Sequence, residues 1–232
     1  MRLDRYLHES GVGTRREANL LVRAGRVAVG GAAAKDGARH VAQGEIVTVD
    51  GEPVAPRGPR VVAFHKPPGL VTAARDRLPT IYSALPFGPE SLLPVGRLDR
   101  ETEGLLLLTN DGVLLHRLTA PRRHVEKEYL ALVSGEVTAA ALARLRAPMD
   151  LGRSDRSRGA IVAELAAPGA VRLTIDEGRY HQVRRMLAGV GLTVLRLTRV
   201  RVGPIELGRL PRGEHRDLTA EESAALRAAV GL

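Results

Sequence analysis

Residues 96–112 read GRLDRETEGLLLLTNDG, from Gly96 to Gly112. The apolar run at 104–109 is short and continuous, which is typical of a strand buried on both faces of a sheet. Asn110, Asp111 and Gly112 follow it and favour the start of a helix that runs to about residue 118. Asp99 stands in the polar turn before the strand, so we expect its carboxylate at the rim of the core.

Periodic segments on both sides of this stretch predict further strands and helices. Strands are expected at 61–64, 127–133, 171–175 and 193–202, and helices at 137–145 and 180–188. A last helix is indicated by Thr219 and Glu222, which form a capping box. Strands and helices do not alternate regularly along 61–232, so we expect an α+β fold there.

The first 48 residues predict a small separate domain. Leu3, Tyr6 and Leu7 follow a helical period, and the capping box of Thr14 and Glu17 begins a second helix that runs to about residue 24. Short strands are expected at 27–29 and 45–49. Residues 51–60 contain three prolines and two glycines without periodicity, so we assign 1–48 to this domain, 49–60 to a linker and 61–232 to the larger domain.

Basic residues dominate the small domain. Residues 1–42 hold 8 basic and 4 acidic side chains. Arg15 and Arg16 lie in the first turn of the second helix, where the helix dipole disfavours cations. Phosphate contact explains them better than stability does, although a small DNA-binding or protein-docking unit is an alternative.

The whole chain of 232 residues has 35 Lys and Arg against 26 Asp and Glu, a net charge of +9. Such a charge favours a polyanionic partner, with nucleic acid before an anionic membrane surface. The absence of Cys excludes disulfides, thiolate metal sites and cysteine nucleophiles, and His spacing gives no zinc motif, so no metal or cofactor is expected. No apolar stretch approaches the roughly 20 residues of a membrane span, so we expect a cytoplasmic protein.

Asp99 is the first candidate for chemistry, because a carboxylate at the rim of a core can act as a nucleophile or as an acid or base. The ordinary alternative is an ion pair with Arg97 or Arg100. In the strand expected at 127–133, period-two alternation places Lys127 and Tyr129 on one face. Tyr129 is therefore either a site residue or a tyrosine of the core.

Four motifs occur in one order along the chain: HKPPG at 65–69, the stretch 96–112, KEY at 127–129 and EGRYHQVRRM at 177–186. Together they resemble the pseudouridine synthases, in the branch that includes ribosomal small subunit pseudouridine synthase A and its large-subunit relatives. Residues 1–48 resemble the S4 RNA-binding domain that this branch carries. The resemblance implies a mixed, largely antiparallel sheet flanked by helices, preceded by a small α/β RNA-binding domain.

The implied reaction converts a uridine of ribosomal RNA into pseudouridine without a metal or cofactor. The resemblance assigns the nucleophile to Asp99, which attacks the ribose or the uracil, and the active-site tyrosine to Tyr129, which contacts the everted base. It assigns the active-site basic residue to Arg184. Helix geometry agrees, because Arg184 flanks the apolar face beside Tyr180 and is expected to pair with Asp99.

Substrate contacts are expected from further residues. Residues 178–205 hold six Arg and no acid, a pattern that suits a phosphate track, and the resemblance places Leu197 against the base. The expected substrate-binding set is Arg97, Leu98, Lys127, Leu197, Arg15, Arg16, Arg179 and Arg185.

The resemblance also bears on the target. Tyr180 and His181 match the small-subunit enzyme better than its relatives, which favours a uridine of 16S rRNA, free or in a small-subunit assembly intermediate, over 23S rRNA. The segment 150–159 matches no known pattern and is a second candidate for substrate choice. We expect a monomer.

Two other functions compete with this interpretation. One is a ribosome-assembly factor that binds RNA without chemistry, and the other is a glycoside hydrolase that pairs Asp99 with Glu101, Glu103 or Asp111. The scarcity of aromatic residues and the positive charge argue against a neutral sugar substrate.

Overall fold

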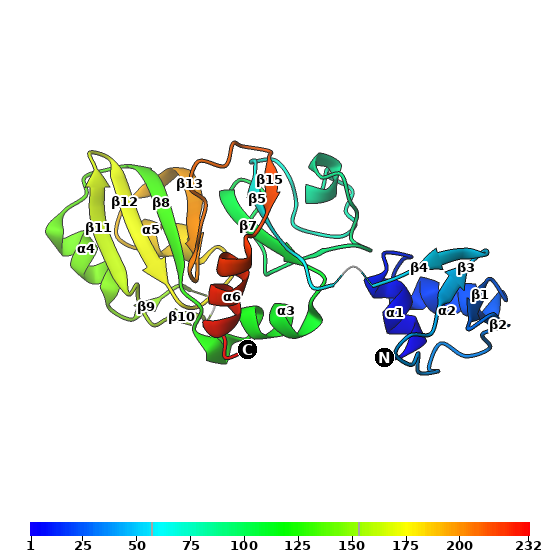
Figure 1. Ribbon diagram of the computed structural model, residues 1–232. Helices are drawn as coiled ribbons and strands as arrows, with labels where there is room; N and C mark the ends of the chain where they lie inside the picture. Colours follow the sequence, from blue (N-terminus) through cyan, green and yellow to red (C-terminus); the bar gives the residue numbers. More distant parts are fainter. Residues whose placement is uncertain (57, 153) are drawn as a thin grey trace. The chain divides into compact units, whose positions relative to one another are not determined.

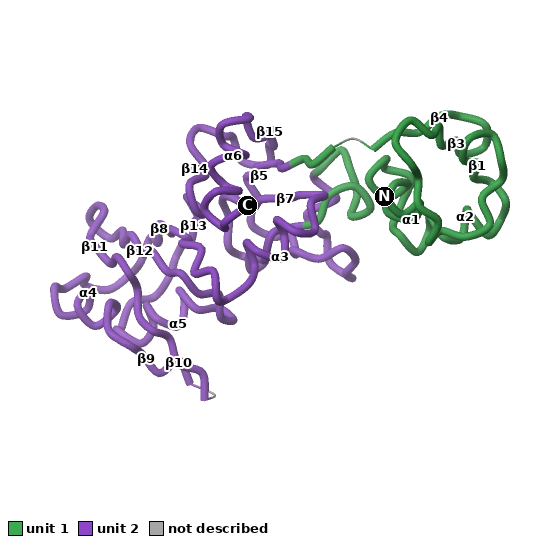
Figure 2. The backbone as a smooth tube through the Cα atoms, turned by 60° about the horizontal axis from the view of Figure 1, so that its bottom comes forward, with its two compact units in different colours: residues 1–60, 85–93 green, residues 61–84, 94–232 purple. Residues whose placement is uncertain are grey.

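The computed structural model describes residues 1–56, 58–152 and 154–232. These residues form two compact units (Figures 1 and 2). Unit 1 comprises residues 1–60 and 85–93, and unit 2 comprises residues 61–84 and 94–232. No helix in the described part of the chain is long and apolar enough to cross a membrane.

Unit 1 combines two helices with a small antiparallel sheet. Its helices are α1 (Leu3–Glu9) and α2 (Arg15–Arg23), and its strands are β1 (Val27–Val29), β2 (Ala32–Ala33), β3 (Val47–Val49) and β4 (Glu52–Val54). The strands lie in the order β2-β1-β3-β4. The core is made of the apolar faces of these elements, with Leu3, Leu7, Ala18, Val22 and Val27 almost wholly buried.

The start of α2 is the predicted capping box. The Glu17 amide donates to Thr14 Oγ1 at 3.2 Å, and the Thr14 amide donates to Glu17 Oε2 at 2.8 Å. Gly30 and Gly31 join β1 to β2 with φ of 61° and 81°, the left-handed pair that a two-residue hairpin requires. Local sequence therefore determines both features.

The segment 49–60 differs from the expected linker, because it contains β4. Pro53 pairs with Thr48 in register, and a proline is tolerated there because β4 is the edge strand. Three residues that include a proline carry no periodic signal, so this strand could not be predicted from its residues. Residue 57, which belongs to this segment, lies outside the described residues.

Unit 2 is built on a long mixed sheet. Its helices are α3 (Gly112–Thr119), α4 (Ala139–Arg146), α5 (Gln182–Ala188) and α6 (Ala220–Ala228), with short 3₁₀ turns η1 (Ile81–Ala84) and η2 (Pro121–Arg123). Its strands are β5 (Val61–Lys66), β7 (Glu103–Thr109), β8 (Lys127–Ser134), β9 (Met149–Asp150), β10 (Arg156–Ser157), β11 (Val162–Ala167), β12 (Ala170–Ile175), β13 (Thr193–Val202), β14 (Ile205–Glu206) and β15 (His215–Asp217). Strand β6 (Leu93–Pro94) stands where the two units meet along the chain.

The sheet follows the order β11-β12-β8-β13-β7-β5-β15, which can be traced in Figure 1. Neighbours along this path are antiparallel except β13 and β7, which are parallel. This arrangement confirms the expected α+β class and the largely antiparallel sheet. Every residue of β7 is buried, as the apolar run at 104–109 predicts.

Gly104 allows the parallel pair to form. It has φ of 109°, and a Cβ atom there would lie 2.2 Å from the carbonyl oxygen of Arg199. Only glycine fits such a close approach between two backbones. The strand that follows Asp99 thus lies directly against β13.

Three features of unit 2 differ from the sequence prediction. Helix α5 begins at Gln182, not at Tyr180, because His181 has the left-handed φ of 51°. Strand β11 was not predicted, since its alanine-rich sequence has no strand period. Strands β9 and β10 pair antiparallel as a hairpin that overlaps the segment 150–159, of which residue 153 lies outside the described residues.

Candidate active site

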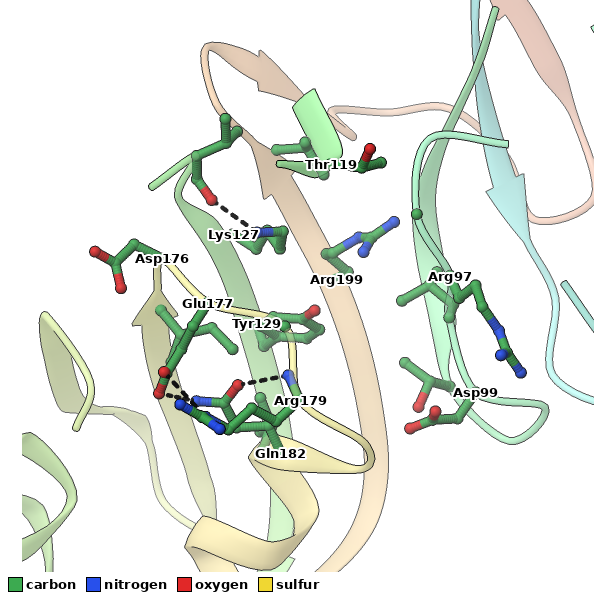
Figure 3. Close-up of a pocket in the computed structure, with 18 of the residues that line it drawn as sticks. Arg97, Asp99, Thr119, Lys127, Tyr129, Asp176, Glu177, Arg179, Gln182 and Arg199 are labelled. Atoms are coloured by element: carbon green, nitrogen blue, oxygen red, sulfur yellow. Dashed lines mark hydrogen bonds and ion pairs between the residues drawn. The ribbon is translucent and has the colours of Figure 1, made fainter. Parts of the chain in front are cut away.

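A pocket of about 440 Å³ opens in unit 2 (Figure 3), within the range of about 300–1,000 Å³ that small-molecule sites occupy. Its walls come from the turn before β7, the start of β8, the end of β12, the start of α5 and the middle of β13. Site residues expected from the sequence that line it are Arg97, Leu98, Asp99, Lys127, Tyr129, Arg179, Arg184 and Leu197.

The turn that carries Asp99 is held by hydrogen bonds from three residues in or close to the motif HKPPG. Thr72 Oγ1 donates to the Leu98 carbonyl at 2.9 Å and accepts from the Leu98 amide at 3.2 Å. The Gly69 amide donates to the Arg100 carbonyl at 2.8 Å. Lys66 Nζ donates to the carbonyls of Arg100 and Thr102 at 3.1 and 2.9 Å, so both sides of the turn are held.

Lys66 is buried completely to make these contacts. Burial lowers its pKa to about 8, against the opposing effect of the nearby carboxylates Glu101, Asp99 and Glu103. A buried ammonium group is stable only when its donors are used, and Lys66 Nζ also donates to the Pro67 carbonyl at 3.0 Å. The motif HKPPG at 65–69 therefore stabilises the turn of the stretch 96–112 that carries Asp99.

Tyr129 faces the pocket from the opposite wall. The pattern of β8 is the predicted alternation, with Tyr129, Ala131 and Val133 buried on one face. In Figure 3 the Asp99 carboxylate and the Tyr129 ring point into the same space from two sides. Lys127 lies above Tyr129 on β8, where burial and the charge of Arg199 lower its pKa to about 8.

The basic side chain beside Asp99 is His181, not Arg184. His181 Nε2 lies 3.6 Å from Asp99 Oδ1, whereas Arg184 Nη2 donates to the Glu101 carbonyl at 3.3 Å. The expected Asp99–Arg184 pair is therefore absent from the described residues. The reason is the left-handed His181, which starts the helix later than predicted and places its own ring beside the carboxylate.

The ordinary pairings of Asp99 are also not observed. Arg100 pairs with Glu101 at 3.4 Å, and Arg97 is exposed and points away from Tyr129 in Figure 3. The side chain of Asp99 is 33% exposed and faces the pocket.

Arg179 and Arg185 have protein partners where substrate contacts were expected. Both donate to Asp155, at 2.5 and 2.8 Å, and Arg185 also donates to the carbonyls of Leu151 and Gly152. Arg185 thus anchors the β9–β10 hairpin, so its guanidinium is engaged by the protein. Arg201, another arginine of the expected phosphate track, forms ion pairs with Glu126 and Glu128.

Several pocket residues belong to stretches that the sequence singled out, but it assigned them no role of their own. Arg199 is only 3% exposed, and its Nε donates to the Leu105 carbonyl on β7 at 2.8 Å. Glu177 accepts from Ser157 Oγ and Gln182 Nε2, both at 2.5 Å, and forms the half-buried base of the turn before α5. These contacts join distant segments, so no local pattern could have indicated them.

The carboxylates that a glycoside hydrolase would pair with Asp99 lie outside the pocket. Glu103 is buried and bound by Arg196 and Arg212, while Asp111 caps α3 and pairs with Arg227. Neither residue lines the pocket, nor does Glu101. The structure therefore does not place Asp99 in a pair with any of these carboxylates. No group of three or more metal-ligating side chains occurs among the residues that the structure describes.

The two arginines of the first turn of α2 differ from each other. Arg15 Nη2 donates to Asp4 Oδ2 at 2.8 Å, while Arg16 is exposed and has no ion-pair partner in the described part of the chain. The Asp4 carboxylate therefore offsets the unfavourable interaction of Arg15 with the helix dipole, and no phosphate is needed to explain Arg15.

Comparisons with known proteins agree with the fold and the pocket. The family of RNA pseudouridylate synthases matches residues 60–189, and the S4 domain matches residues 1–47. The chain therefore belongs to the RNA pseudouridylate synthase family, whose members are isomerases. The four motifs that suggested this family all lie in the matched region.

Relatives of similar length share the whole chain. An uncharacterized RNA pseudouridine synthase of Aquifex aeolicus is 40% identical over 100% of this chain and 96% of its own. The ribosomal small subunit pseudouridine synthase A of Salmonella typhimurium is 39% identical over 97% of this chain and 100% of its own. A crystal structure of a pseudouridylate synthase superposes with a TM-score of 0.69, at 34% identity, over 97% of this chain and 99% of that one.

Proposed function

We propose that this protein converts a uridine of 16S ribosomal RNA into pseudouridine, in the cytoplasm. The observation that carries the proposal is the facing pair of Asp99 and Tyr129 in one pocket of a chain that belongs to the synthase family. The 16S target is supported by the full-length similarity to ribosomal small subunit pseudouridine synthase A. The same chemistry on 23S rRNA is the alternative.

The reaction conserves every atom of the base. The bond between uracil N1 and the ribose carbon 1′ breaks, the uracil turns, and its carbon 5 bonds to carbon 1′. Carbon 5 loses its hydrogen to solvent and N1 gains one. The balance needs no oxidant, reductant or energy donor.

Asp99 is the proposed nucleophile. Attack on carbon 1′ of the ribose and attack on carbon 6 of uracil are both compatible with a carboxylate that faces the pocket. The turn around it is held by Lys66 and Thr72, so the carboxylate is oriented before substrate arrives. Everting the uridine into the pocket allows the Asp99 carboxylate to reach atoms that stacking would cover.

Tyr129 is proposed to stack on the uracil and to accept the carbon 5 proton. Its ring lies at the wall facing Asp99, and the same pocket is lined by Leu197, which is the apolar residue expected against the base. Arg184 lines the same pocket and is free to turn toward Asp99 or a phosphate, since its present contact is a single carbonyl at 3.3 Å.

The S4 domain is proposed to bind the same RNA through its basic face. Arg16 is the strongest candidate contact in it because its charge is exposed and unpaired among the described residues. The proposed partner is rRNA, free or in a small-subunit assembly intermediate, and the proposed enzyme acts as a monomer.

Pseudouridine mapping tests the proposal. Ribosomal RNA from cells with and without the gene is compared at every uridine, and purified protein is then added to unmodified 16S and 23S transcripts that carry tritium at uridine carbon 5. The proposal expects one lost site in 16S rRNA and tritium release from the 16S transcript. Loss of a 23S site would reassign the target, and no release from either transcript would contradict the activity.

A further inference from the structure

Tyr180 and His181 form a stacked ring pair at the edge of the pocket. Their centroids are 3.9 Å apart, and the ring planes differ by 15°. Tyr180 is 69% exposed, the most exposed of the large apolar or aromatic side chains in the described chain. An exposed aromatic ring is unusual in a sequence that holds only two Phe and four Tyr, and it requires an explanation.

The pair lies next to the proposed nucleophile. Tyr180 lines the pocket, and His181 Nε2 is 3.6 Å from Asp99 Oδ1. His181 covers one face of the Tyr180 ring, so the opposite face is open to a further planar group. Any RNA whose uridine reaches Asp99 passes close to this open face.

The segment that carries the pair is held from behind. Arg179 and Arg185, on either side of it, both donate to Asp155 on the hairpin, and Arg185 Nη1 also donates to the Tyr180 carbonyl at 3.0 Å. The Arg179 amide donates to Gln182 Oε1 at 3.0 Å, and Gln182 Nε2 donates to buried Ser157 Oγ. A platform fixed in this way loses little conformational freedom when it binds a ligand.

We infer that Tyr180, backed by His181, is a stacking platform for a nucleobase that neighbours the target uridine in the RNA chain. The inference rests on the proposed function, because it takes the pocket to hold an everted uridine. A nucleobase fits the open ring face better than a sugar or an aliphatic side chain, since planar π systems stack face to face with an offset. The segment 150–159 would then act on substrate choice indirectly, through Asp155.

Tritium release from the mapped rRNA fragment provides the first measurement. Removal of the ring in Tyr180→Leu is expected to lower kcat/KM at least about fivefold, within the roughly 5- to 150-fold that stacking of one base represents. Tyr180→Phe keeps the ring and is expected to retain wild-type values. Leu165→Ala removes another exposed apolar side chain, from β11, and serves as the control.

Fluorescence provides the second measurement. Short RNAs that contain the target uridine carry 2-aminopurine at each flanking position in turn, because stacking on an aromatic ring quenches this base. We expect quenching at one flanking position with wild-type protein and Tyr180→Phe, and its loss with Tyr180→Leu.

The outcomes separate the two proposals. Wild-type protein that releases no tritium would contradict the proposed function itself. If the wild-type protein releases tritium and Tyr180→Leu equals it in kcat/KM and in quenching, the stacking role of Tyr180 is contradicted and the proposed function is not.

Discussion

Lys66 Nζ donates a hydrogen bond of 2.9 Å to the carbonyl oxygen of Thr102, three residues beyond the proposed nucleophile. This contact connects the motif at 65–69 to the turn at 98–102, and it explains why a fully buried lysine is retained next to the pocket. The ammonium group replaces backbone partners that an irregular turn cannot provide for itself.

Replacement of Lys66 tests this support. Lys66→Met keeps the volume but leaves buried carbonyls without a donor, so we expect a loss of about 1–3 kcal/mol in the free energy of unfolding, together with a loss of turnover. Urea denaturation and tritium release measure the two effects. Lys35→Met, at an exposed position, is the matched control, and equal behaviour of the two variants would contradict the role of Lys66.

Arg184 and Arg185 are adjacent in α5 but are expected to fail in different ways. Arg184→Ala should lower kcat roughly 100-fold with an unchanged melting temperature, because Arg184 lines the pocket and makes one long contact with the protein. Arg185→Ala should lower the melting temperature by several degrees, because its guanidinium holds Leu151, Gly152 and Asp155. Equal losses of turnover at equal stability would contradict this division.

Arg15 and Arg16 should contribute unequally to RNA binding. Arg16→Ala removes an exposed charge and should lower the slope of log affinity against log salt by about 1. Arg15→Ala should lower it by less, because Arg15 is paired with Asp4. Filter binding of rRNA at several salt concentrations measures both slopes, and a larger effect at Arg15 would refute the assignment.

Asp4 makes the stability of unit 1 depend on pH. Burial alone would raise the pKa of its carboxyl, but hydrogen bonds from Arg2 and Arg15 outweigh burial and lower it to about 2. A pKa below the unfolded value stabilises the folded state above about pH 4, and this roughly 2 kcal/mol is lost as the pH falls toward 2. Amide hydrogen exchange in α1 should therefore differ between wild type and Asp4→Asn at pH 6 and converge near pH 2. A constant difference would contradict the linkage.

Sequence predicted the features that local rules determine. The capping boxes that start α2 and α6 were found because Thr14 and Thr219 bond residues three positions away. The alternation that buries Tyr129 and the apolar run of β7 were equally readable. These elements were enough to indicate the fold class, whereas the expectation that Asp99 and Tyr129 share one site came from the resemblance to the synthase family.

What sequence could not predict depends on contacts between distant segments. The partner of Asp99 is His181 because a left-handed residue delays the start of α5, and that conformation accompanies the buried contacts of Gln182 and Glu177. The partners of Arg185 lie on a hairpin 30 to 34 residues away along the chain. Helical angles correctly directed Arg184 to the pocket and Arg185 away from it, but they could not give the partner of either side chain.

Tritium release by Asp99→Asn tests the central claim most directly. The substitution removes the charge and the nucleophile but keeps the shape, so the variant should bind 16S rRNA with wild-type affinity and an unchanged melting temperature while releasing no tritium from carbon 5 of uridine. Release at a rate near that of the wild type would show that another group carries out the reaction.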